Sequence, residues 1–173
     1  ELLERVAYLW KNERQKLLCA GNEITQAINQ RHSDSGQEPD RAIVETAYSQ
    51  LQRRFDHNWG GFGTAPKFPT PHNLLFLMRY AHAMQEPDAF KMATVTLKDM
   101  ARGGIHDHIG GGFSRYSTDK KWLVPHFEKM LYDNALLLMA YVAAYQNIKE
   151  ERFADVAHRT ADYILRELTD EQG

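Results

Sequence analysis

Apolar residues recur at the spacing of an α-helix along most of the chain, and no segment shows the alternation typical of a β-strand. Leu2, Val6 and Leu9 begin this pattern, which predicts one long helix that reaches about residue 29. A polar stretch at 31–38 follows it. The other predicted helices cover 39–55, with Pro39 at the start, then 71–84, 87–102, 125–146 and 151–168.

The predicted helices after residue 39 are of two kinds. Those at 87–102 and 151–168 carry apolar residues on one side, whereas those at 71–84 and 125–146 are apolar nearly all round. A helix that is apolar all round is buried on every side. Alternating exposed and enclosed helices predict an all-α fold, a two-layer α/α toroid or solenoid of helical hairpins. The expected division is a lead-in helix and loop over 1–38 and alternating outer and inner helices over 39–173.

Two glycine-rich loops precede the two enclosed helices and resemble each other. Asp56-His-Asn-Trp-Gly-Gly-Phe62 and Asp107-His-Ile-Gly-Gly-Gly-Phe113 both read D-x-x-x-G-G-F, and a Pro-His pair follows each. The reverse connections are short, so both loops are expected on one rim, above the N-termini of the inner helices. Aspartate can accept hydrogen bonds from turn amides, so a purely structural turn and a loop that also lines a ligand site both fit the motif.

Composition and charge exclude several classes of function. The 173 residues include 21 Lys and Arg against 23 Asp and Glu, a net charge of −2 that gives no attraction to nucleic acid or to an anionic membrane. Cys19 is the single cysteine, so no intrachain disulfide forms. No apolar run is long enough to cross a bilayer, and the first residues are not a signal peptide. We interpret the chain as a piece of a longer, cytoplasmic protein.

The stretch 115–134 holds most of the candidate chemistry, at the mouth of a predicted buried helix. In a helix from residue 125, His126, Lys129 and Asp133 share one face. The simpler interpretation is a Lys129–Asp133 ion pair, with Glu128 offsetting the helix dipole. The alternative is a site in which Glu128 or Asp133 is the general acid or base, and His126 is an alternative base. The further carboxylates available for a glycosidase-type pair are Asp56, Asp107 and Asp119.

Other residue types suggest a sugar as the ligand rather than a metal or cofactor. Trp59 and Trp122 present flat apolar faces beside carboxylates, and Arg115 or Lys67 would hold hydroxyls or a carboxylate. The segment His106-Asp107-His108 has the H-x-H spacing of a metal site but no third ligand, so no metal is expected. Nucleotide, phosphate and serine-nucleophile motifs are absent from the sequence, and no cofactor is expected.

Four longer motifs, Trp59–Pro69, Gly103–Asp107, Gly110–Ser117 and Trp122–Ala135, resemble the YyaL / spermatogenesis-associated protein 20 family. The resemblance covers nearly the whole chain. It implies the first part, about three hairpins, of an (α/α)6 six-hairpin toroid that follows a thioredoxin-like domain. Such toroids also occur in glycosidases and N-acylglucosamine 2-epimerases. The motif positions carried over as a site are Asp56, Trp59, Lys67, Asp107, Arg115, Trp122, His126, Glu128, Lys129 and Asp133.

Two functions of different classes follow. In the first, the domain is a carbohydrate-active toroid in which Glu128, Asp133, His126 and Asp107 supply acid and base groups. In the second, it is a non-catalytic scaffold that binds a ligand or peptide for the thioredoxin-like neighbour. Part of a toroid also leaves the flanks of its inner helices uncovered, so self-association is expected.

Overall fold

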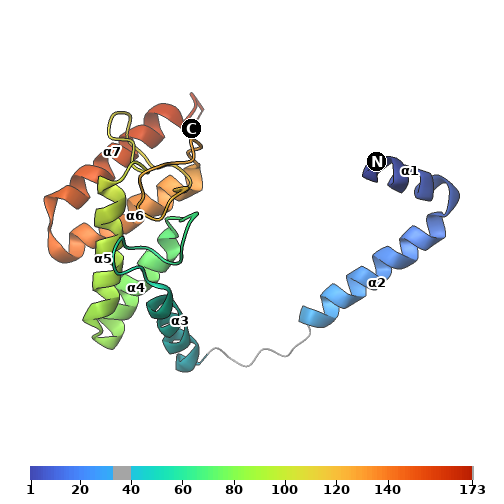
Figure 1. Ribbon diagram of the computed structural model, residues 1–173, viewed down its shortest axis with the longest axis horizontal. Coiled ribbons are helices and arrows are strands. Elements are labelled where there is room, and N and C mark those ends of the chain that lie inside the picture. The colour runs from blue at the N-terminus through green and yellow to red at the C-terminus, as the bar shows by residue number, and fades with distance from the viewer. Residues whose placement is uncertain (33–39, 173) are drawn as a thin grey trace. The chain divides into compact units, whose positions relative to one another are not determined.

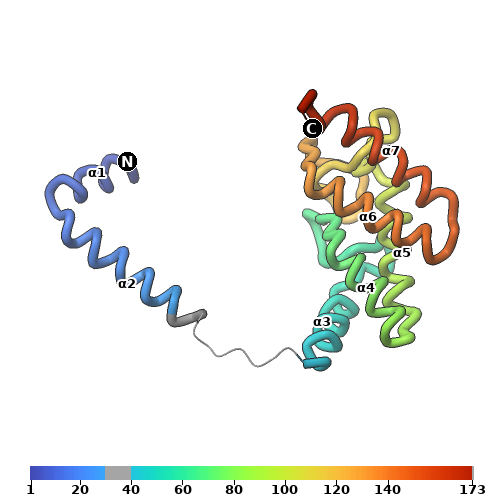
Figure 2. Tube along the Cα trace, turned by 180° about the vertical axis from the view of Figure 1, so that it is seen from behind, coloured from blue at the N-terminus to red at the C-terminus, as the bar shows by residue number. Residues whose placement is uncertain are grey.

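The computed structural model describes residues 1–32 and 40–172, and every regular element in those ranges is an α-helix (Figures 1 and 2). The all-α prediction is therefore confirmed. The chain divides into two compact units, Glu1–Arg41 and Ala42–Gly173, here called unit 1 and unit 2. Within the described ranges, no helix is both long and apolar enough to cross a membrane. The predicted helix start at Pro39 and most of the polar stretch lie outside the described residues.

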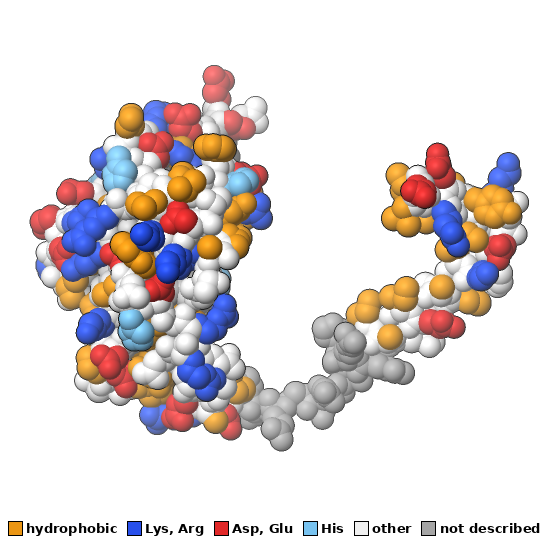
Figure 3. Space-filling model, viewed as in Figure 1, with side chains coloured by type: hydrophobic (Ala, Val, Ile, Leu, Met, Phe, Trp, Pro, Cys, Tyr) orange, Lys and Arg blue, Asp and Glu red, His pale blue; other side chains and the backbone are white. Residues whose placement is uncertain are grey.

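Unit 1 contains two helices, α1 (Leu2–Asn12) and α2 (Arg14–His32), where the sequence predicted one. The chain leaves the helical conformation at Glu13, with φ −136° and ψ 41°. The Asn12 side chain donates to the Tyr8 carbonyl at 2.8 Å. Such local bonds to the backbone are why Asn favours helix ends over helix interiors. On the face that Figure 3 shows, hydrophobic side chains follow one edge of α2, and the exposed apolar residues of this helix include Leu18, Ile24 and Ile28.

Unit 2 is built around two inner helices, α4 (Pro71–Met84) and α6 (Leu131–Ile148), which pack against each other (Figure 1). The outer helix α5 (Pro87–Arg102) packs on α4, and α7 (Glu151–Glu167) packs on α6. The remaining helix, α3 (Arg41–Arg54), contributes Tyr48, whose ring stacks on Tyr80 of α4 at 4.5 Å. The bounds predicted for α4 and α5 are confirmed, and α7 ends one residue before the predicted limit.

The start of α6 was predicted wrongly. The helix begins at Leu131 rather than near residue 125 because the segment before it pairs with residues 115–118. The Arg115 N–H donates to the Glu128 carbonyl at 2.7 Å, and two further backbone bonds join the same two segments. Backbone groups committed to this pairing are not available to an α-helix.

This shift changes which side chains lie together. His126 and Lys129 precede α6, so they do not share a helix face with Asp133. The expected Lys129–Asp133 ion pair does not form, because the Lys129 ammonium binds Asp107 at 2.8 Å instead. Glu128 lies outside the first turn of α6 and forms an ion pair with Arg115.

The all-round apolar character of the inner helices predicted burial on every side, whereas a partial toroid was expected to leave their flanks uncovered, and α6 has such an uncovered flank. It packs against α4 and α7, and its remaining flank leaves Met139 and Val142 exposed at 51% and 39%. By contrast, the amphipathic outer helix α5 buries eight of its residues. An apolar groove adjoins the open flank and is lined by Leu138, Val142, Tyr145, Ala154, Ala157, His158 and Ala161.

The two glycine-rich loops, 55–70 and 103–130, meet at one end of unit 2, which we call the rim (Figure 2). Lys67 and Ser117 exchange two backbone hydrogen bonds, at 2.8 and 2.9 Å. The Trp122 indole N–H donates to the Trp59 carbonyl at 2.7 Å. The prediction that both loops share one end is therefore confirmed.

Candidate functional site

The first copy of the D-x-x-x-G-G-F turn is held by its aspartate and by a lysine. Asp56 Oδ1 accepts from the backbone N–H groups of Asn58 and Trp59, at 3.0 and 3.1 Å. The Lys67 ammonium donates to Asp56 Oδ2 at 2.7 Å and to the Gly60 carbonyl at 2.8 Å. One lysine thus fixes the turn to the segment that leads into α4. We call this arrangement the first staple.

The second copy has the same arrangement, here called the second staple. Asp107 Oδ1 accepts from the N–H groups of Ile109 and Gly110, at 2.9 and 2.8 Å. The Lys129 ammonium donates to Asp107 Oδ2 at 2.8 Å and to the Gly111 carbonyl at 2.9 Å. The predicted internal repeat is therefore a repeat in hydrogen bonding as well as in sequence.

The staples lower the pKa of both aspartates. Burial alone would raise the pKa of Asp56, but the hydrogen bonds from Lys67 and the turn amides outweigh it and lower that pKa. The hydrogen bond from Lys129 is the main cause that holds the pKa of Asp107 well below its usual range. These four residues, all predicted for the site, use their charged groups to hold the loops. A further candidate carboxylate, Asp119, accepts from the N–H groups of Lys121, Leu123 and Val124.

The two predicted sugar-stacking tryptophans lie in different surroundings. The Trp122 side chain is fully buried, and its ring covers the first staple, 5.2 Å from the Lys67 ammonium. Trp59 remains 38% exposed, with the Lys121 ammonium 5.2 Å from its ring centre. Of the two, Trp59 is accessible to a ligand at the surface.

The remaining predicted residues gather where the rim meets α6. The Arg115 guanidinium binds Glu128 Oε2 at 3.0 Å and also contacts the Tyr132 hydroxyl. Burial raises the pKa of the Asp133 carboxyl, and the positive charge of Arg115 partly opposes this rise. We call Arg115, His126, Glu128, Tyr132 and Asp133 the rim cluster. It combines two carboxyl groups in different surroundings with one cation and one imidazole.

Unpaired polar atoms occur at the entrances of both inner helices. Within the described ranges, four side-chain atoms are buried without a hydrogen-bond partner in the protein, and three of them lie at the entrances of the inner helices. They are Oγ1 of Thr70 before α4, Nδ1 of His126 before α6, and Oδ2 of Asp133 in the first turn of α6. Buried polar groups in native proteins are nearly always paired. The three atoms are enclosed by protein, so a ligand would reach them only if the side chains around them moved.

Aromatic rings connect the unpaired atoms across the two loops. The His126 ring stacks on Tyr116 at 4.6 Å, and Tyr116 packs against Phe68 at 4.8 Å. Phe68 is 44% exposed and lies two residues before Thr70. Thr70 was not among the residues predicted for the site, although a threonine directly before the Pro-His start of a helix is a signal for an N-cap residue.

The histidines of the H-x-H segment are used locally. His106 is buried, its Nδ1 lies 3.3 Å from the Ala101 carbonyl, and its ring stacks on Phe113 at 4.8 Å. Burial, aided by the nearby His108, lowers the pKa of His106 to about 4. His108 Nε2 lies 3.0 Å from the Gly103 carbonyl. Both rings thus have one nitrogen on a backbone oxygen.

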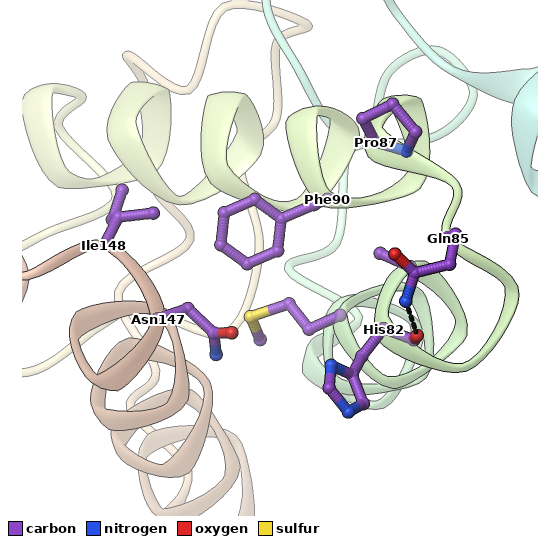
Figure 4. A pocket seen from close by; sticks show the side chains of 8 residues that line it. His82, Gln85, Pro87, Phe90, Asn147 and Ile148 are labelled. Atoms are coloured by element: carbon purple, nitrogen blue, oxygen red, sulfur yellow. Dashed lines mark hydrogen bonds between the residues drawn. The ribbon is translucent and has the colours of Figure 1, made fainter.

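Unit 2 has pockets at both ends. The rim pocket, about 430 Å³, is lined by Asp107, Gly110, Phe127, Lys129, Tyr163, Arg166 and Glu167. A pocket of about 480 Å³ lies at the other end, where α4 and α6 finish and α5 begins (Figure 4). Its lining includes Phe90, His82 and Asn147 but no carboxylate. The charged candidates from the sequence are therefore found at the rim.

Comparisons with known proteins give close relatives in sequence, although no protein-family model matches the chain. The chain is 42% identical to spermatogenesis-associated protein 20 of Homo sapiens and 42% identical to that of Mus musculus, in both cases over 99% of this chain. It spans 23% of the length of these curated relatives.

Solved structures share the fold over about three quarters of the chain. A cellobiose 2-epimerase from Bacillus thermoamylovorans aligns with 77% of this chain, and 39% of its own, at a TM-score of 0.63 and 15% identity. A sugar epimerase from a ruminal bacterium aligns with 76% of this chain and 39% of its own, at a TM-score of 0.62 and 16% identity. An unsaturated glucuronyl hydrolase specific for heparin aligns with 72% of this chain and 37% of its own, at a TM-score of 0.51 and 17% identity. The expected fold, a partial (α/α)6 toroid, is therefore confirmed.

Proposed function

Since this chain belongs to the spermatogenesis-associated protein 20 family, we propose that its rim binds carbohydrate, with the rim cluster as the site of an epimerase- or glycosidase-like activity. The observation that carries this proposal is the half-exposed Arg115–Glu128 ion pair, with the Asp133 carboxyl near enough to feel the charge of Arg115 and with the His126 ring stacked on Tyr116, the residue after Arg115. Sugars present hydroxyl groups and apolar C–H faces, and the cluster adjoins the exposed ring of Phe68. The sugar enzymes among the structural neighbours support the proposal by analogy of fold.

The two carboxyl groups are assigned different roles. Burial favours the protonated form of Asp133, which suits a general acid. Glu128 is exposed and paired with Arg115, which suits a carboxylate that accepts a proton or stabilises positive charge. Two carboxyl groups in different surroundings can divide acid and base work in this way. His126 adds a free imidazole nitrogen, and Asp107 has a structural role in the second staple.

The test is sugar binding by the full-length protein with Asp133→Asn and Glu128→Gln. Each variant keeps the side-chain shape but removes the carboxylate, so we expect sugar affinity to fall at least tenfold in titration calorimetry. Glu150→Gln is the matched control, because Glu150 forms a similar half-exposed ion pair with Lys98 at the α6–α7 turn, away from the rim. Wild-type affinity in both rim variants would remove the cluster from the site.

A non-catalytic scaffold is the second candidate function, and exposed apolar residues on the rim favour it. Ile109 is 97% exposed and Phe127 is 94% exposed, although both are large apolar side chains. Such residues suit the docking of a peptide or of the thioredoxin-like neighbour that the family resemblance implies. Tight peptide binding without any response to sugars would favour this function.

Self-association through the open flank of α6 is a separate proposal, which light scattering tests.

A further inference from the structure

Resting on the proposed function, we infer that the rim cluster selects uncharged sugars and rejects uronates, whose carboxylate would find no unbalanced cation there. Proteins that recognise a carboxylate do so most often with an arginine or lysine whose charge is available to the ligand. The cations that the sequence predicted for this site are Lys67, Arg115 and Lys129.

Two of these cations are committed to the staples. The Lys67 side chain is fully buried, and its ammonium binds Asp56 and the Gly60 carbonyl. The Lys129 ammonium binds Asp107 at 2.8 Å and lies 4.3 Å from the centre of the Tyr163 ring. Turning either lysine toward a ligand would leave an aspartate without its partner and open a turn.

The third cation already has a carboxylate partner. Arg115 binds Glu128 at 3.0 Å, and the Asp133 carboxyl is near enough for the charge of Arg115 to act on it. The Arg115–Glu128 pair is half-exposed, with side chains 42% and 45% accessible, so separating it costs little in itself. A uronate that took Arg115 would, however, bring a second carboxylate beside Glu128. Like charges at this distance repel.

Sugar hydroxyls match the cluster without this conflict. A hydroxyl group both donates and accepts, so it can donate to the carboxylate of Glu128 while it accepts from Arg115. The exposed face of Phe68 suits the apolar side of a pyranose ring.

The test compares three matched pairs of sugars on the full-length protein by titration calorimetry at pH 7. The pairs are glucose and glucuronate, galactose and galacturonate, and mannose and mannuronate, which differ only in the group at C6. For the pair that binds, we expect at least tenfold tighter binding of the neutral sugar. Glu128→Gln leaves Arg115 without its partner, so it should tighten binding of the uronate itself at least threefold and reduce that ratio, whereas Glu150→Gln should change neither.

The outcomes separate the inferred preference for neutral sugars from the proposed carbohydrate binding on which it rests. A neutral preference that shrinks in Glu128→Gln supports the inference. A uronate that binds the wild type as tightly as its neutral partner overturns the inference and leaves carbohydrate binding standing. A neutral preference that Glu128→Gln leaves unchanged also overturns it, because charge balance would not be the cause. If no sugar of the six binds, the proposed function fails and the inference fails with it.

Discussion

The two staples have the same hydrogen bonds in different surroundings. In the first, the Lys67 side chain is fully buried beneath Trp122, whereas in the second, the Lys129 side chain is 18% exposed and lines the rim pocket. The residue before the aspartate also differs. Phe55 packs on Phe62 at 5.9 Å in the first copy, and His106 stacks on Phe113 at 4.8 Å in the second. One local motif thus serves as part of the core in one loop and as the wall of an open pocket in the other.

Replacing the lysine of each staple should give the largest difference in stability between the two copies of the motif. Lys67→Met leaves Asp56 and the Gly60 carbonyl without their buried partner, so we expect a loss of about 3–5 kcal/mol in the free energy of unfolding. Lys129→Met breaks a pair that water already reaches, so we expect about 1 kcal/mol. Urea denaturation measures both. Equal losses in the two variants would contradict the difference in burial.

Glycine replacement tests how closely Trp122 covers the first staple. Gly61 and Gly63 both have positive φ, 75° and 83°, but a Cβ at residue 61 would lie 2.5 Å from the Trp122 ring, whereas one at residue 63 has no atom nearer than 3.6 Å. We expect Gly61→Ala to cost about 3 kcal/mol through backbone strain and overpacking. Gly63→Ala is the matched control and should cost about 1 kcal/mol through strain alone. Denaturation curves that coincide for the two variants would show that the ring is not tightly seated.

His106 should make the second copy sensitive to pH. Its pKa falls from 6.5 to about 4 on folding, so the unfolded chain binds more protons between these values and stability decreases as pH falls through that window. The expected loss between pH 7.5 and pH 5 is about 2 kcal/mol. The groups that act on it are His108, Arg159, Asp107 and the Ala101 carbonyl.

Replacing His106 with the residue of the first copy is the matched test. His106→Phe should keep the stacking on Phe113 and remove this loss of stability between pH 7.5 and pH 5, measured by urea denaturation across that range. The pKa values of Asp56 and Asp107 are lowered, so their contribution is lost only as pH falls below about 4. A His106→Phe variant with the wild-type pH dependence would place the titrating group elsewhere.

The sequence predicted those features that local signals determine. Proline at the first position and a left-handed residue after the last one bound α4, and short reverse turns put both loops at one end. The start of α6 depends on pairing with residues 115–118, which no local pattern reveals. The lysine partners of the two aspartates lie 11 and 22 residues further along the chain, so local sequence patterns could not predict the staples either. For the same reason Thr70 became a candidate only when the structure showed its unpaired oxygen.

The most direct test of the account compares Asp133→Asn in the rim cluster with Asp107→Asn in the second staple, by titrating the full-length protein with the neutral sugar that binds best. Unfolding curves of both variants are recorded alongside. The account predicts that Asp133→Asn loses at least tenfold in affinity with its free energy of unfolding nearly unchanged, and that Asp107→Asn loses stability but keeps its affinity. Loss of binding in a fully folded Asp107→Asn variant, with wild-type affinity in Asp133→Asn, would contradict it.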